Sequence, residues 1–99
     1  MTDHLRLALK QTLEGLVTLA DDDGEGPTSL VHLNWMVREA LEKIDVWPVD
    51  KTSRWIGFIQ GCLACKGMLD VNAERDRTRP IFHEAYEAMG LEIPKTVER

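Results

Sequence analysis

Basic and aromatic side chains gather in the middle of the chain, where together they have the chemistry to bind an anion that carries an aromatic ring. A guanidinium fork binds a phosphate or carboxylate through two parallel hydrogen bonds, and an indole ring stacks on a base. The candidate ligand-binding residues are Lys51, Arg54, Trp55, Arg75, Arg79 and His83. This set predicts a site for an anionic, nucleotide-like small molecule, with Trp47 as a further stacking ring.

These residues form one site only if two helices bring them together. If the helix that carries Arg79 and His83 packs antiparallel to the preceding helix, its later turns approach Lys51 and Arg54. The alternative is that the arginines of residues 74–79 pair with their neighbouring acids on a solvated face, where such pairs contribute little.

Cys62 and Cys65 could be read as half of a zinc site, but the rest of the site does not follow. Structural zinc needs a second pair of cysteines or a spaced pair of histidines, and the chain has neither. A reactive pair usually lies at the amino end of a helix, whereas this pair lies near the carboxyl end of an expected one. We therefore expect two buried, reduced thiols, and neither a metal nor a cofactor.

The sequence also lacks the motifs that are typical of catalytic sites and of calcium-binding loops. Ser53 and His83 belong to no nucleophile elbow, and no glycine-rich phosphate loop is present. The acidic loop at residues 21–27 lacks the distal glutamate of a calcium loop. The chain is therefore expected to be non-enzymatic, with a solvated acidic linker.

The elements that carry these residues are predicted to be helices. Apolar residues recur at steps of three and four over residues 5–20 and 30–44. The helix expected at residues 52–68 is apolar around most of its circumference, which is typical of a helix buried on several sides. The sequence thus predicts one all-α domain over residues 1–99, a compact bundle of four to five helices around the 52–68 helix, with an extended tail at 91–99.

Capping residues and breakers set the expected helix limits. Short polar residues cap helix starts, whereas glycine ends helices. Pro80 is expected to kink or restart the last helix, because it removes a backbone donor. The expected caps are Asp3, Thr28 or Ser29, Asp50 and Asp70, and the expected ends are Gly67 and Gly90.

Gly57 and Gly61 stand four apart in the apolar helix, where each costs about 1 kcal/mol relative to alanine. Close packing against another helix of the chain, contact with a second copy, or a ligand lying on the glycines would offset that cost. Trp35 lies on a face of its own helix that is less easily explained. These three residues predict a packing surface and favour a homo-oligomer.

Net charge and hydropathy limit the classes of partner that we expect. The net charge is −5, with 4 Lys/Arg against 10 Asp/Glu in residues 1–50 and 6 against 3 in residues 51–79. General nucleic-acid binding is not expected, because it needs a basic face. No apolar run is long enough to span a membrane, and residues 1–4 lack the basic start of a signal peptide. We therefore expect a cytoplasmic protein without a membrane partner.

Two stretches carry a resemblance to a known group. Residues 54–61 (RWIGFIQG) and 74–83 (ERDRTRPIFH) give the pattern RWxGFxQG…ERxxTRPxFH. This pattern resembles small, mostly uncharacterised accessory proteins of tailed bacteriophages and prophages, over about residues 28–90. The resemblance implies action on the host, such as blocking a defence system or sequestering its nucleotide signal.

Together these features predict a non-enzymatic phage accessory protein that acts by binding, with counter-defence sequestration of a nucleotide-like ligand as the leading function. One alternative is a protein-interaction module that inhibits a host protein through the acidic first half, imitating the charge of nucleic acid. Another is a structural or packaging accessory.

Overall fold

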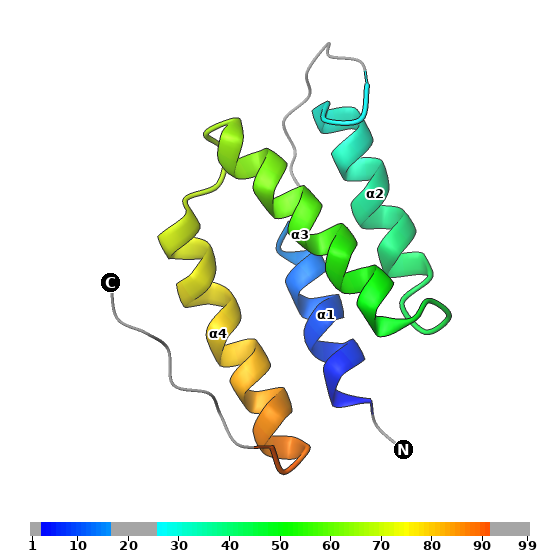
Figure 1. Ribbon diagram of the computed structural model, residues 1–99, viewed down its shortest axis with the longest axis vertical. Helices are drawn as coiled ribbons and strands as arrows, with labels where there is room; N and C mark the ends of the chain where they lie inside the picture. The colour runs from blue at the N-terminus through cyan, green and yellow to red at the C-terminus, as the bar shows by residue number, and fades with distance from the viewer. Residues whose placement is uncertain (1–2, 17–25, 92–99) are drawn as a thin grey trace.

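The fold, seen in a computed structural model, is all-helical. The structure describes residues 3–16 and 26–91, which contain α1 (His4–Glu14), α2 (Leu30–Glu42), α3 (Val49–Cys65) and α4 (Val71–Ala88) and no strand (Figure 1). This arrangement confirms the all-α class, and the four helices of the described residues fit the predicted four to five. The acidic residues 21–25 and the tail from residue 92 lie outside the described residues.

Three of the four expected caps are confirmed. The side chains of Asp3, Ser29 and Asp70 each accept a hydrogen bond from the backbone N–H three residues later. Asp50 is not the cap of α3, because Pro48 holds that position and no side chain caps the helix. The prediction for Asp50 was wrong because Pro48, with its fixed φ, begins the helix two residues earlier.

Glycines end α3 and α4 as predicted. Gly67 and Gly90 have φ of 73° and 74°, in the left-handed region that favours glycine. The N–H of Met68 donates to the Leu63 carbonyl at 3.0 Å, and the N–H of Leu91 donates to the Tyr86 carbonyl at 2.8 Å. These bonds satisfy carbonyls that a helix end leaves open.

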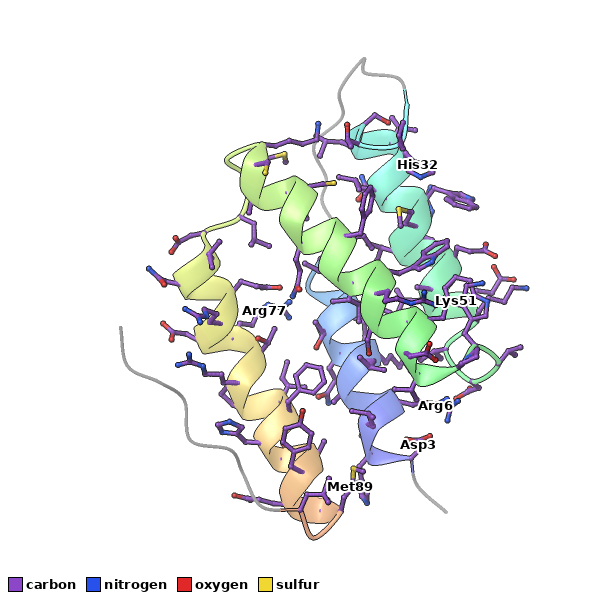
Figure 2. The ribbon with its side chains drawn as sticks, viewed as in Figure 1. Asp3, Arg6, His32, Lys51, Arg77 and Met89 are labelled. Carbon is purple, nitrogen blue, oxygen red and sulfur yellow. The ribbon has the colours of Figure 1, made fainter. Side chains whose placement is uncertain are left out.

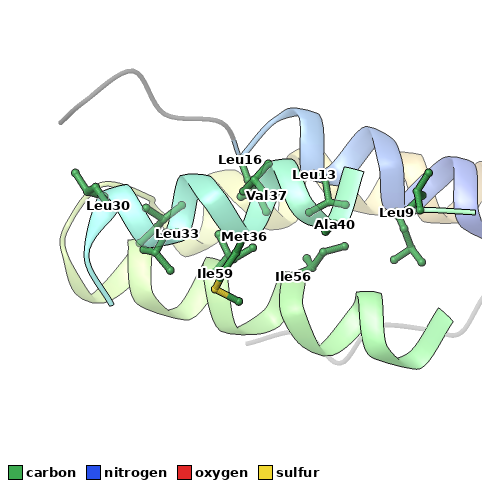
Figure 3. Close-up of a cluster of buried hydrophobic side chains, with 12 residues drawn as sticks. Leu9, Leu13, Leu16, Leu30, Leu33, Met36, Val37, Ala40, Ile56 and Ile59 are labelled. Carbon is green, nitrogen blue, oxygen red and sulfur yellow. The ribbon is translucent and has the colours of Figure 1, made fainter. Parts of the chain in front are cut away.

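The core lies where α1, α2 and α3 meet (Figure 3). In the described part of the chain, α1 packs against each of the other three helices. The expected central position of the 52–68 helix is not confirmed. Helix α3 buries one stripe, formed by Thr52, Ile56, Ile59 and Leu63, while Phe58 stays 42% exposed.

Helix α4 runs roughly antiparallel to α3 but packs against α1 (Figure 1). Ala8 of α1 and Ala85 of α4 are both buried at this contact, and two small side chains let the helices come close. The helix runs without interruption through Pro80, so it does not restart there, and the kink stays a prediction. The Thr78 hydroxyl donates to the Glu74 carbonyl at 3.0 Å within this turn.

No helix in residues 3–16 and 26–91 has both the length and the apolar character that a bilayer crossing requires.

Candidate ligand-binding groove

An open groove of about 650 Å³ lies between α2 and α3. Its described lining comprises His32 and Met36 of α2 with Lys51, Arg54, Trp55 and Phe58 of α3. Figure 2 shows His32 and Lys51 on these two helices, on the side of the molecule away from α4. Half of the predicted ligand-binding residues therefore meet in one groove.

Helical spacing explains why these side chains share the groove. Lys51, Arg54 and Phe58 follow one another at steps of three and four along α3, so they share a face. The opposite face of α3 buries Ile56 and Ile59 in the core. The core contact therefore turns the lining residues outward, toward α2.

Three indole rings and one imidazole form an aromatic row across α2, α3 and the connection between them. The Trp47 and Trp55 ring centroids lie 4.6 Å apart, edge to face, and the Trp35 and Trp55 centroids lie 6.1 Å apart. The His32 ring stacks on Trp35 at 5.5 Å. These separations are in the favourable range for ring pairs. Trp35 remains 46% exposed, so the row presents ring surface to solvent.

The two cations of the groove are held differently. Lys51 Nζ lies 4.1 Å from the Trp47 ring centroid and 5.9 Å from that of Trp55, both within cation–π range. Arg54 pairs with Asp50 at 3.7 Å, and these side chains are 75% and 77% exposed. An exposed pair of that length contributes little, so an incoming anion can replace Asp50. No carboxylate is among the groove's described lining residues.

The other half of the predicted set lies elsewhere. Arg75, Arg79 and His83 are carried by α4, which packs on α1, and none of them lines the groove. The expected convergence depended on α4 folding back along α3. Within the described residues the structure thus separates the six candidates into two groups, and a ligand role for the α4 group stays a prediction.

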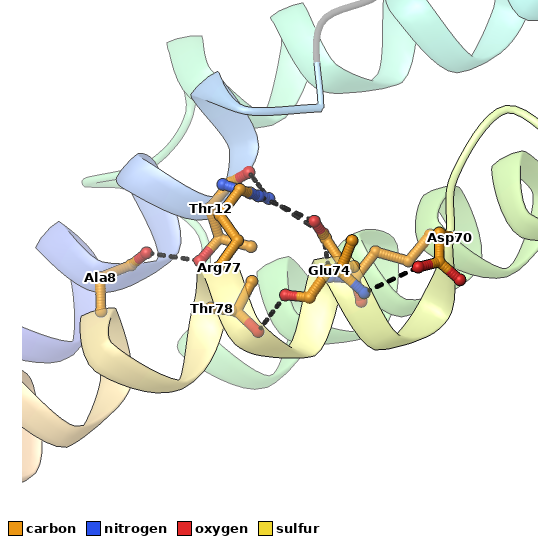
Figure 4. Close-up of polar contacts among 8 residues, drawn as sticks. Ala8, Thr12, Asp70, Glu74, Arg77 and Thr78 are labelled. Carbon is orange, nitrogen blue, oxygen red and sulfur yellow. Dashed lines mark hydrogen bonds and ion pairs between the residues drawn. The ribbon is translucent and has the colours of Figure 1, made fainter.

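Arg77, which the sequence placed with its neighbours on a solvated face, instead lies between α4 and α1 (Figure 4). Its Nε donates to Glu74 Oε1 at 2.8 Å, and its Nη2 donates to Glu74 Oε2 at 2.9 Å and to the Thr12 carbonyl at 3.1 Å. Glu74 Oε2 also accepts from Gln60 Nε2 of α3 at 2.8 Å. Arg77 therefore pairs with a neighbouring acid, as the alternative expectation had it. The pair lies at the contact of α4 with α1 and α3 rather than on a solvated face.

The surroundings of Glu74 change its acidity. Its side chain is only 10% exposed, and burial alone would raise the pKa of the carboxyl. The hydrogen bonds from Arg77 and Gln60, with the charge of Arg77, outweigh burial and lower the pKa. Glu74 is therefore held as a carboxylate.

Arg6, near the amino end of α1, joins helices as Arg77 does at the carboxyl end. Its Nε donates to the Ile44 carbonyl and its Nη2 to the Trp47 carbonyl, each at 3.1 Å, and it pairs with Asp3. Arg6 thereby attaches the connection between α2 and α3, including the backbone of Trp47, to α1. The sequence analysis did not predict this role of Arg6. The available signal was an acid three residues before the arginine, a spacing that Asp3 and Arg6 share with Glu74 and Arg77.

The glycines and cysteines of α3 have more open surroundings than expected. No atom outside the local helix lies within 4 Å of a Cβ added at Gly57 or Gly61, so close packing within the described chain is not their reason. Cys65 is exposed and Cys62 is half-buried, and both are free thiols. The prediction of a buried pair was wrong for Cys65, which lies on the outer face of α3.

Comparisons of the chain with family models, curated proteins and solved structures find no match. Among the described residues, no group of three or more histidine, cysteine, aspartate or glutamate side chains is placed to hold a metal ion. The groove between α2 and α3 is therefore the feature from which a function can be inferred.

Proposed function

We propose that this chain is a non-enzymatic binding protein whose α2–α3 groove holds an anionic, nucleotide-like ligand. The observation that carries the proposal is the meeting of Lys51 and Arg54 with the Trp55 ring in a groove whose described lining has no carboxylate. In a chain of net charge −5, such a local excess of positive charge attracts an anion.

Each part of a nucleotide has a matching group. The exposed guanidinium of Arg54 can bind two phosphate oxygens in place of Asp50. Lys51 adds a second positive charge, and Trp55 offers a ring on which a base can stack. The groove volume of about 650 Å³ suits a small-molecule ligand of this size.

The biological setting follows from the resemblance to phage accessory proteins. In that setting the protein would act in the host cytoplasm and sequester a nucleotide signal of a defence system. Inhibition of a host protein through the acidic first half is the alternative that shares the same setting. It depends partly on residues 21–25, which lie outside the described part of the chain.

Calorimetric titration with adenosine and guanosine monophosphates tests the groove. We expect Arg54→Ala to weaken binding about tenfold, because a hydrogen bond to a charged group contributes about 1.5–3 kcal/mol. Lys10→Ala removes an exposed charge from α1, outside the groove, and should leave binding unchanged. Absence of binding by the unaltered protein at about 1 mM ligand would reject the proposal, since the affinity would then be negligible.

Self-association through the outer face of α3 is a second candidate property. It is favoured by the open space beside Gly57 and Gly61, with the exposed ring of Phe58 next to them. A second copy packed there would cover Phe58 and explain two glycines that weaken the helix.

Sedimentation velocity tests this association. A dimer of the unaltered protein should dissociate when Gly61→Arg places a long charged side chain on that face. Glu87→Arg, at an exposed position of α4, serves as the control. A monomer at every concentration of the unaltered protein would reject self-association, and a dimer that Gly61→Arg leaves intact would reject this face.

A further inference from the structure

A second hollow adjoins the groove. It has a volume of about 760 Å³, is open to solvent, and includes His32, Trp35 and Arg38 of α2 in its lining. His32 also lines the first groove, so the two hollows meet at this side chain. One continuous surface therefore runs from α3 across His32 to the outer side of α2.

The two hollows repeat the same chemistry. The first has the Trp55 ring with Lys51 and Arg54, and the second has the Trp35 ring with Arg38. The Trp35 and Trp55 centroids are 6.1 Å apart. Among their described lining residues neither hollow has a carboxylate, although the chain has 17 acids against 12 bases.

We propose that the ligand is a dinucleotide, with one nucleotide unit in each hollow and the link between them passing His32. This inference depends on the proposed function, because it names the ligand class for the same site. Each hollow is large enough for one unit. Joining two units makes the second contact intramolecular, and so raises affinity without any new contact.

Charge limits the ligand to about this length. Beyond Arg38, α2 continues with Glu39 and Glu42. A longer strand would have to bring its phosphates toward these carboxylates, which repel them. The surface therefore favours a short ligand with two phosphate groups over a nucleic-acid chain.

Calorimetric titration with three probes tests the inference, each probe in adenine and guanine forms. The probes are the mononucleotide, the 5′-phosphorylated dinucleotide and the 5′-phosphorylated hexanucleotide. We expect the dinucleotide to bind once per chain and about 100-fold more tightly than the mononucleotide. The hexanucleotide should bind no more tightly than the dinucleotide.

Substitution of Arg38 separates the two hollows. Arg38→Ala should weaken dinucleotide binding about tenfold and leave the mononucleotide affinity of the first groove unchanged. Lys10→Ala, which removes an exposed charge from α1, should change neither. Circular dichroism of both variants checks that the helices are intact.

The failures of the two proposals are distinguishable. Mononucleotide binding that depends on Arg54, with no gain for the dinucleotide or no effect of Arg38→Ala, would overturn the dinucleotide inference and leave the proposed function standing. A hexanucleotide that binds far more tightly than the dinucleotide would also overturn it, in favour of a strand-binding surface. Binding of none of the three probes would reject both.

Discussion

Arg54 and Arg77 belong to the same basic stretch of sequence, yet they serve two different regions of the molecule. Arg54 lies in the α2–α3 groove, 75% exposed, with one 3.7 Å contact to Asp50. Arg77 lies between α4 and α1, where it donates to both oxygens of Glu74 and to the Thr12 carbonyl. The first guanidinium is available to a ligand, whereas the second is part of the packing.

The difference between them comes from the helix ends. The last carbonyls of a helix have no partner within it, and a cation near that end is favoured by the helix dipole. Arg77 reaches the end of α1 next to Gly15, where a Cβ would overlap its guanidinium. Arg54 lies in the second turn of α3, where no carbonyl needs a donor, so its charge stays on the surface.

Replacing Arg77 is expected to have the largest effect on stability. Arg77→Ala leaves the Thr12 carbonyl without its donor and the nearly buried Glu74 without its cation. We expect the free energy of unfolding to fall by about 2–4 kcal/mol, as measured by urea denaturation. Arg54→Ala is the matched comparison, because it removes an arginine with no such contacts.

Gly15→Ala tests the same contact from the side of α1. Gly15 has φ of −78°, which alanine adopts without strain, so the added methyl group acts only by displacing Arg77. We expect a loss of about 1–2 kcal/mol from the weakened hydrogen bonds. In the Arg77→Ala background the same change should be neutral or stabilising by about 0.4–1 kcal/mol. An equal loss in both backgrounds would show that Gly15 and Arg77 are not coupled.

The Glu74 carboxylate makes this region sensitive to acid. Its pKa is lowered in the folded protein from an ordinary value of 4.5. Its contribution is therefore complete above about pH 4.5 and is lost as the pH falls through the folded pKa. Glu74→Gln should lose less stability than the unaltered protein as the pH falls below about 4.5 in urea denaturation.

The titration of Asp3 does not affect the comparison of Glu74→Gln with the unaltered protein. Its pKa is also lowered, first by the hydrogen bond from the Arg6 backbone N–H and then by the Arg6 side chain. It titrates in both proteins alike, so its contribution cancels from the difference. Equal acid sensitivity of Glu74→Gln and the unaltered protein would contradict the role given to Glu74.

A substitution in the groove is expected to have the smallest effect on the free energy of unfolding when no ligand is bound. Arg54→Ala removes only an exposed pair, so its free energy of unfolding should stay within about 0.5 kcal/mol of that of the unaltered protein. Urea denaturation of this variant beside Arg77→Ala measures the contrast directly. A loss as large as that of Arg77→Ala would mean that Arg54 is structural.

The sequence predicted local structure better than it predicted packing. The helices and three of their caps follow from spacing and from short polar residues, which act within one turn. Packing of α4 on α1 brings together Ala8 and Ala85. The spacing of Ala85 with its apolar neighbours predicts a buried face, but it does not show which other helix that face packs against. For the same reason Arg77 could not be told from Arg75 and Arg79 before the end of α1 was placed.

Only half of the candidate site could be predicted from the sequence. Lys51, Arg54 and Trp55 belong to one helix, so their common face could be read from spacing alone. His32 lies on α2, and only the contact between α2 and α3 brings it to the groove. Arg38 lines the second hollow, whose described lining lies on α2 and the residues just before it. The α4 residues were included because their charge was suitable, which is not enough to place them.

Ligand binding in the α2–α3 groove is most directly tested by a two-dimensional ¹⁵N NMR titration with a nucleotide. The indole N–H of Trp55 and the backbone amides around Lys51 and Arg54 should shift most. The amides of Arg75, Arg79 and His83, on α4, should stay in place. Shifts confined to α4, or no shift in α2 and α3 at saturating nucleotide, would contradict the account.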